Sequence, residues 1–327
     1  MSLLDEVLEL RLQVLKRYPE TVLDDGGTEL LRGTFQKHLD GAKKIKTLSD
    51  SSGLRGVVAL GAPQPAMLGL DNTHCHLDFR QGDLEAQAWG ADMLCDWIPR
   101  LDDSFVLMLD PVYRSLLPTV TQAGLRVQAL LLHGRPEEAL RAIGGPPNRE
   151  RLLDEGGLSI EPLSSSEQVE HLVRLRHRYF TTHPQHSPMS TQRQIDESQQ
   201  AQINEFVRKK LLKSVQTKSD TQFVVLQGTE VMGGFGLILH EHNPTLGFCA
   251  GVEIFLDPSV HGRGVGTLAY RILLQRMIEL GVRVFKGTTA NPAVIHLARK
   301  MKRRLRGWKL VPGSCPEIPE YFDYPLT

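Results

Sequence analysis

The segment DPSVHGRGVGT, residues 257–267, places three glycines at alternate positions between an apolar run and a helical pattern. Glycine has no Cβ, so Gly262, Gly264 and Gly266 leave backbone amides uncovered and permit turn conformations that other residues avoid. Amides at a helix N-terminus have no partner inside the helix and attract anions. The segment therefore predicts a strand-to-helix junction that binds a diphosphate, or alternatively a turn that merely joins two elements.

Apolar periodicities and turn residues around this junction predict an ordered series of elements. In chain order they are a strand at 158–163, helices at 168–179 and 194–212, strands at 223–226, 231–239 and 248–256, a helix after Gly266, a strand at 282–285, a helix from Asn291 and a strand at 308–311. The glycines follow a hairpin, whereas a dinucleotide-binding fold has them after its first strand. A P-loop requires a Gly-Lys-Ser/Thr ending, which this segment does not have.

This order resembles the GNAT acyltransferase family over residues 157–313. The resemblance depends on the run LDPSVHGRGVG at 256–266, similar to the family's strand end and pyrophosphate loop, and on the later helix at 291–300. It implies an α/β fold with a mixed sheet, and acetyl-CoA as co-substrate without a metal. It also implies an N-acyltransferase that moves an acetyl or other short acyl group to an amine by direct attack in a ternary complex.

The resemblance assigns coenzyme-binding roles residue by residue. The pyrophosphate loop corresponds to seven consecutive positions: His261, Gly262, Arg263, Gly264, Val265, Gly266 and Thr267. A histidine stands at 261, where the family usually has Arg or Gln, and it would make binding sensitive to pH between about 6 and 7. Asn291 corresponds to a residue that faces the coenzyme arm. Because it precedes Pro292, it is also expected as a helix N-cap.

Acyl transfer to an amine needs a base for the nucleophile and a hydrogen-bond donor for the developing oxyanion. Alternation along 248–256 places Glu253 and its odd-numbered neighbours on one face of the strand, and the even-numbered residues on the other. Glu253 matches a position where many GNAT proteins carry an acid and is the candidate base, with a solvent-facing acid as the alternative. The main-chain amides of Ile254 and Leu256 are the candidate oxyanion donors.

The general acid and the acceptor site are less well specified by the sequence. Family members often have a tyrosine seven residues after the asparagine, whereas this chain has Ala298. A thiol with a pKa of about 8.5 is nevertheless a tolerable leaving group without full protonation. The loop at 181–191 corresponds to the region that shapes the acceptor pocket in the family. His183, His186 and Gln194 are therefore candidate substrate residues for a small-molecule or protein amine.

A boundary is predicted near 144–157, where GGPPNRERLLDEGG combines glycines, prolines and charges. It divides the chain into a mixed α/β domain at 1–150, the acyl-CoA-binding catalytic domain at 157–313 and a tail at 314–327. The segment 116–133 repeats the helix, glycine, strand order of 297–311, with Gly124 and Gly307 in corresponding places. The N-terminal domain is therefore predicted as a degenerate GNAT-like scaffold, unless the match is chance. No glycine loop precedes this repeat, so coenzyme binding is not expected there.

Composition, 41% hydrophobic and 23% charged, fits a globular chain of about two domains. Four dispersed cysteines favour a reducing compartment, and the acidic N-terminus and the lack of a long apolar run disfavour export and membranes, so we expect a cytoplasmic protein. Residues 1–155 hold 17 basic and 23 acidic side chains, and 156–327 hold 21 and 15. This small imbalance permits an anionic ligand and does not fix a partner. The oligomeric state is left open.

Three other motifs have an ordinary and a sharper interpretation. His74 and His76 form an H-x-H pair, but no second ligand cluster follows, so packed or surface histidines are favoured over a metal site. The pair at His240 and His242 is interpreted in the same way. The run 299–309 holds seven Lys or Arg and is expected as a solvated helix face, or as a contact for the coenzyme 3′-phosphate or RNA. Two rivals to the enzyme therefore remain, a non-catalytic acyl-CoA-sensing or interaction module and an RNA-associated protein.

Overall fold

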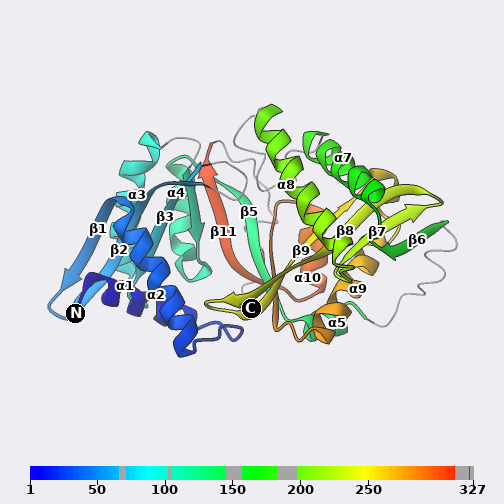
Figure 1. The fold of residues 1–327 in the computed structure, drawn as a ribbon. Coiled ribbons are helices and arrows are strands. Elements are labelled where there is room, and N and C mark those ends of the chain that lie inside the picture. The colour runs from blue at the N-terminus through cyan, green and yellow to red at the C-terminus, as the bar shows by residue number, and fades with distance from the viewer. Residues whose placement is uncertain (66–70, 102–104, 145–156, 183–196, 314–323, 325–327) are drawn as a thin grey trace. The chain divides into compact units, whose positions relative to one another are not determined.

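The computed structural model describes residues 1–65, 71–101, 105–144, 157–182, 197–313 and 324. Figure 1 shows its ribbon, and the chain divides into two compact units. Unit 1 comprises 1–131, 242–247 and 305–327, and unit 2 comprises 132–241 and 248–304.

Unit 1 combines helices with a mixed sheet. Its elements are α1 (Leu3–Leu15), α2 (Asp25–Asp40), β1 (Ala42–Asp50), β2 (Gly53–Pro65), β3 (Asp71–Phe79), α3 (Leu84–Trp97), β4 (Phe105–Leu109), α4 (Leu117–Gln122), β5 (Leu125–Gly134) and β11 (Arg304–Pro312). The strand order is β1-β2-β3-β4-β11-β5. The strands β3 and β4 form a parallel pair, and β11 runs antiparallel to β4. The amphipathic helices α1 and α2 bury Val7, Leu10 and Phe35 against Val57 of β2.

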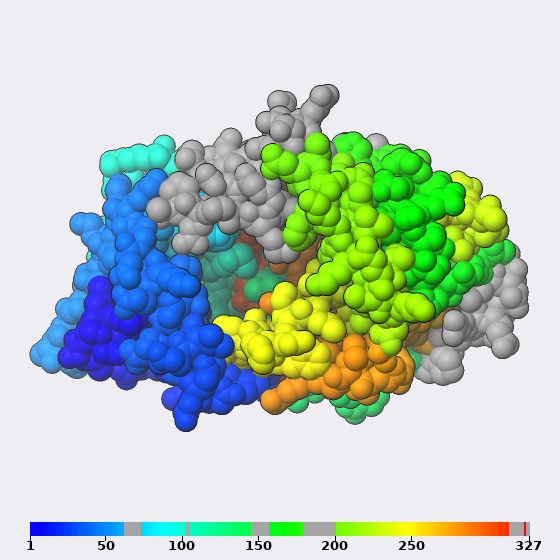
Figure 2. Space-filling model, in the orientation of Figure 1, coloured from blue at the N-terminus to red at the C-terminus, as the bar shows by residue number. Residues whose placement is uncertain are grey.

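Unit 2 has the same kinds of layers. Its elements are α5 (Pro136–Ala142), β6 (Leu158–Pro162), α7 (Ser166–Thr182), α8 (Glu197–Gln216), β7 (Gln222–Gln227), β8 (Glu230–Asn243), β9 (Gly247–Leu256), α9 (Val265–Glu279), β10 (Val284–Thr289) and α10 (Pro292–Lys300). The strand order is β10-β9-β8-β7-β6, with β9 and β10 parallel. One face of this sheet packs against α9, and the other packs against α7 and α8. In the space-filling view α8 lies at the surface of unit 2 (Figure 2).

The two halves of the chain repeat one order of elements. The series α1-α2-β1-β2-β3-α3-β4-α4-β5 recurs as α7-α8-β7-β8-β9-α9-β10-α10-β11. In the first series the parallel strands β3 and β4 precede and follow α3, and in the second β9 and β10 precede and follow α9. The pairing covers three residues of each strand in both cases. The predicted α/β fold with a mixed sheet is confirmed.

The compact units differ from the predicted division at 1–150 and 157–313 at both ends. Residues 132–144 belong to unit 2, because α5 packs on α9 and Arg271 donates to the carbonyls of Ile143 and Gly144, each at 2.6 Å. Residues 305–313 belong to unit 1, because β11 pairs with β4. Most of the predicted boundary and most of the predicted tail at 314–327 lie outside the described residues. The functional division of the chain stays a prediction.

Two expectations about the C-terminal part are wrong. Gly307 lies inside β11, where a Cβ would stand 3.3 Å from the carbonyl oxygen of Leu109, whereas Gly124 precedes β5 with a φ of +111°. The two glycines are therefore not equivalent. The basic run 299–309 is also not a solvated helix face, because α10 ends at Lys300 and the rest of the run enters β11. Arg303 and Arg306 are buried there, at 4% and 9% exposure.

Candidate functional site

The junction between β9 and α9 has the open geometry that its glycines predict. Gly264 is the N-cap of α9 with a φ of +82°, and no side chain caps the helix. Gly262 has a φ of +74°, and a Cβ added to it would meet nothing within 4 Å. Glycine is needed at both positions, because such φ values are unfavourable for other residues. The first turn of α9 contains no acid, so nothing in that turn repels an anion.

This open N-terminus contrasts with four other helices of the chain. The helices α1, α2, α3 and α10 are each capped by a side-chain oxygen, from Ser2, Asp24, Asp83 and Asn291. Such a cap satisfies amides that would otherwise need water or a ligand. The N-terminus of α9 is therefore suited to an external acceptor such as a phosphate oxygen.

The side chains around the junction hold its shape. Asp257 accepts hydrogen bonds from the amide and hydroxyl of Ser259, at 3.0 and 2.8 Å, and forms an ion pair with Arg178 of α7. His261 is exposed, and its Nε2 lies 3.1 Å from the carbonyl oxygen of Leu256. The imidazole thus contacts the end of β9, a placement that the sequence does not reveal.

The end of β9 separates from its parallel neighbour. The pairing with β10 runs from Cys249 to Gly251, opposite Val284 to Lys286, although β9 continues to Leu256. The predicted alternation is confirmed along this stretch. Ile254 and Leu256 contact the core beneath α9, while Glu253 faces α8.

Glu253 is engaged in an ion pair. The Nζ atom of Lys210, in α8, lies 2.6 Å from Glu253 Oε2, and the two side chains are 28% and 39% exposed. Arg176 of α7 is also close enough to Glu253 to interact electrostatically. The carboxylate is therefore partly accessible and lies beside cations, and its assignment as the base stays a prediction.

The residues of α10 separate into structural and open positions. Asn291 is the N-cap, and its side-chain oxygen accepts from the amide of Ala293 at 2.9 Å, as expected. Ala298 is fully buried, whereas His296 is exposed and therefore lies on another face. No hydroxyl is thus present at the position where the family often has tyrosine.

The candidate substrate residues His183, His186 and Gln194 lie outside the described residues.

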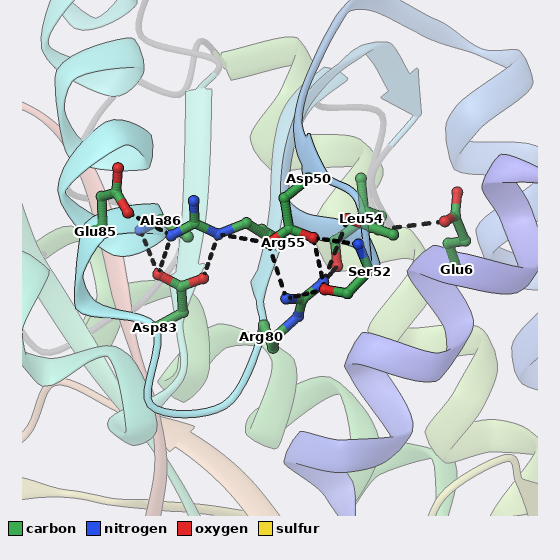
Figure 3. A network of polar contacts seen from close by, with 10 residues as sticks. Glu6, Asp50, Ser52, Leu54, Arg55, Arg80, Asp83, Glu85 and Ala86 are labelled. Carbon is green, nitrogen blue, oxygen red and sulfur yellow. Dashed lines mark hydrogen bonds and ion pairs between the residues drawn. The ribbon is translucent and has the colours of Figure 1, made fainter.

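In unit 1 the helix that corresponds to α9 is α3, and a side chain caps its N-terminus. Asp83 caps α3 by accepting from the amide of Ala86 at 2.9 Å, and Arg55 binds both of its oxygens at 2.7 and 2.8 Å (Figure 3). Glu85 joins the same guanidinium. A side-chain carboxylate thus occupies the N-terminus that remains open in unit 2. Because it would also repel a phosphate, it supports the expectation that unit 1 binds no coenzyme.

Replacing Asp83 by alanine is expected to lower the free energy of unfolding by about 1 to 2 kcal/mol, through loss of the cap and of a partly exposed ion pair. The hydrogen bonds from Arg55 lower the pKa of Asp83 to about 2. Its contribution is therefore complete above pH 4 or so, the ordinary range for aspartate, and is lost as the pH falls toward 2. Urea unfolding of both proteins at pH 7 and pH 3 would measure this. An unchanged difference at the two pH values would contradict the assigned role.

The H-x-H pair lies beside a cavity in unit 1. His74, His76 and His38 line a space of about 260 Å³ together with Arg11 and Met108. Burial lowers the pKa values of His38 and His74, and His76 Nε2 lies 2.8 Å from Asp78 Oδ2. Within the described part of the chain no three His, Cys, Asp or Glu side chains are arranged to hold a metal ion.

The described helices include none with the length and apolarity needed to cross a membrane.

Comparison with known proteins supports the class that this geometry indicates. Residues 173–302 match the sequence model of the acetyltransferase (GNAT) family. No curated protein matches the chain in sequence. The structure is similar to a GCN5-related N-acetyltransferase from Sphaerobacter thermophilus, with 11% identity over 88% of this chain and 86% of that chain and a TM-score of 0.51.

Two further similar structures contain GNAT regions. One is a fungal multi-domain β-N-acetylglucosaminidase with a GCN5-related glucosamine N-acetyltransferase region, at 13% identity over 94% of this chain and a TM-score of 0.52. This chain spans 36% of that protein's length. The other is a tandem GNAT protein from the clavulanic acid biosynthesis pathway, at 12% identity over 94% of each chain and a TM-score of 0.44.

The segment 173–302 therefore carries the match to the acetyltransferase (GNAT) family model. This segment contains the open junction at Gly264, the separated end of β9 and the ion pair at Glu253. The predicted resemblance to this family is confirmed for the C-terminal part of the chain.

Proposed function

We propose that unit 2 is an N-acyltransferase, which moves an acetyl or other short acyl group from acyl-CoA to an amine by direct attack in a ternary complex. The observation that carries this proposal is the uncapped N-terminus of α9 behind Gly264, beside the end of β9. Amides at that terminus would bind the pyrophosphate, with Gly262 and Gly266 allowing its approach. His261, Arg263, Val265 and Thr267 complete the proposed loop, and Asn291 is proposed to face the coenzyme arm beside its capping role.

The proposed chemistry uses the C-terminal end of β9, next to the glycine junction. Glu253 would accept the proton of the attacking amine, directly or through water. The amides of Ile254 and Leu256 are the proposed donors to the thioester oxyanion, because backbone groups fixed in a strand need little reorganisation. With Ala298 in place of a tyrosine, the thiolate would leave without a neighbouring hydroxyl, which its pKa of about 8.5 permits.

A panel experiment tests this function. The protein is incubated with acetyl-CoA and a series of primary amines, while free thiol and acylated amine are both measured. Release of thiol in step with acylation of an amine would support the enzyme. The second candidate, a non-catalytic acyl-CoA sensor, is favoured by the buried Ala298. It predicts saturable binding of acetyl-CoA without thiol release. Failure of acetyl-CoA to bind at all would contradict both.

Replacing Glu253 by glutamine is expected to lower turnover about a hundredfold at neutral pH, the usual contribution of a general base. The affinity for acetyl-CoA should change little, because the carboxylate faces α8 rather than the glycine junction. Rates across pH 6 to 9 and a separate coenzyme titration give the two quantities. Glu205→Gln, on α8 and paired with Arg208, is the matched control and should retain activity. A pH–rate profile unaltered by Glu253→Gln would argue against this base.

A further inference from the structure

The face of β9 that lies toward α7 and α8 gathers positive charge around Glu253. Lys210 reaches Glu253 from α8 at 2.6 Å. Lys286, in β10, is in parallel register with Gly251, so its side chain points to the same face as Glu253 two residues further along. His240 belongs to this group, because Lys286 and Lys210 both add to the effect of burial in lowering its pKa. These four side chains come from three strands and one helix.

Gly251 lies in the middle of this group and has no side chain. The three heavy atoms nearest to a Cβ placed there all belong to Ile238, at 3.5 to 3.8 Å, which is ordinary van der Waals contact. In the part of the chain that the structure describes, no atom of α7 or α8 is therefore closer than 3.8 Å to that position. A small ligand group could lie there, with Lys286 on one side and the Lys210–Glu253 pair on the other.

The charges in this group do not balance. Glu253 is the only carboxylate that β9 directs to this face, and Lys210 and Lys286 are two cations beside it. Arg176 also interacts electrostatically with Glu253, and it is not counted in this balance. Cations that are partly removed from water gain most from an anion placed directly against them. A neutral amine would leave this excess charge uncompensated.

We propose that the acceptor amine carries a carboxylate or a phosphate, which Lys286 and Lys210 bind above Gly251 while the amine is directed to Glu253. This inference rests on the proposed acyltransferase function and names its class of acceptor. The anionic group would fix the orientation of the acceptor, so it should act mainly on acceptor affinity.

A matched series of acceptors tests the proposal. Ethanolamine, β-alanine and O-phosphoethanolamine present one amine on the same two-carbon spacer with a neutral, carboxylate or phosphate end, and homologues with longer spacers extend each arm. The kcat/KM of at least one anionic arm is expected to exceed that of its neutral partner by about tenfold or more. The arm with the larger value identifies the carboxylate or the phosphate as the recognised group.

Variants of the cations supply the second measurement. Lys286→Gln is expected to raise KM for the anionic acceptor about tenfold, to leave KM for the neutral amine unchanged and to leave the dissociation constant of acetyl-CoA unchanged. Lys286→Glu should reverse the preference toward neutral or cationic amines. Lys209→Gln is the matched control, because Lys209 adjoins Lys210 on α8 but is 75% exposed and pairs with Glu205.

The possible failures are distinguishable. Equal kcat/KM for neutral and anionic amines in every arm would overturn the charged acceptor and leave the acyltransferase intact. An anionic preference that survives Lys286→Gln would overturn the assigned binding residues. Binding of acetyl-CoA without thiol release for any amine would overturn both the acceptor class and the proposed enzyme.

Discussion

Gly264→Asp is expected to abolish acetyl-CoA binding, weakening the dissociation constant by at least about a hundredfold, since a like charge against a bound anion costs several kcal/mol. The new carboxylate would cap α9, as Asp83 caps α3. Aspartate tolerates the left-handed backbone at this position better than most residues, so the fold should survive. A calorimetric titration of acetyl-CoA into the variant measures the loss.

Two companion variants separate charge from backbone conformation. Gly264→Asn has nearly the same shape as Gly264→Asp without its charge, so it should weaken binding less. Gly281→Asn places the same strain at the opposite end of the helix, where Gly281 has a φ of +73°, and should leave coenzyme binding unaltered. If Gly264→Asp binds acetyl-CoA as tightly as the parent protein, the pyrophosphate is not held at α9 and the proposed function loses its main support.

Arg11→Met is expected to destabilise unit 1 by about 3 to 5 kcal/mol, because it removes the cation that two buried carboxylates share. Arg11 Nε lies 3.3 Å from Oδ2 of Asp78, whose side chain is fully buried, and Nη1 lies 3.6 Å from Oδ2 of Asp110. Burial already raises the pKa of Asp110, and Arg11 opposes this shift. Urea unfolding followed by circular dichroism measures the change in stability.

The controls for this prediction use the same substitution elsewhere. Arg32→Met removes an ion pair with Asp5 whose partners are both more than a third exposed, so it should change stability by less than about 1 kcal/mol. Adding Asp78→Asn to Arg11→Met should recover part of the loss, because one uncompensated charge is then removed. Equal effects of Arg11→Met and Arg32→Met would show that the buried pair does not stabilise unit 1.

The order of elements in the second half of the chain was accessible from sequence because local signals agree there. The helical spacing around Leu273 marks the body of α9, while the glycine at 281 and the cap at Asn291 mark element ends, and the structure confirms all three. What the sequence could not indicate is which unit each strand joins. Apolar alternation in β11 shows that it is a strand, but its pairing with β4 depends on residues about 200 positions earlier in the chain.

The candidate site shows the same limit. The residues of the glycine junction are adjacent in sequence, and the conformation of each glycine has a physical reason, so the junction could be predicted. Lys210 and Lys286 could not, because they come from a helix and a strand that meet β9 only in the folded chain. Asp83 was recognisable in principle as an acidic cap before a helix. Its bearing on function emerges only when α3 is compared with α9.

The placement of β11 has a consequence for biosynthesis. This strand lies between β4 and β5 in unit 1, yet it is among the last described segments to leave the ribosome. The sheet of the amino-terminal unit therefore stays incomplete while more than half of the chain is being translated. During that interval the edges of β4 and β5 that later pair with β11 are open to wrong partners.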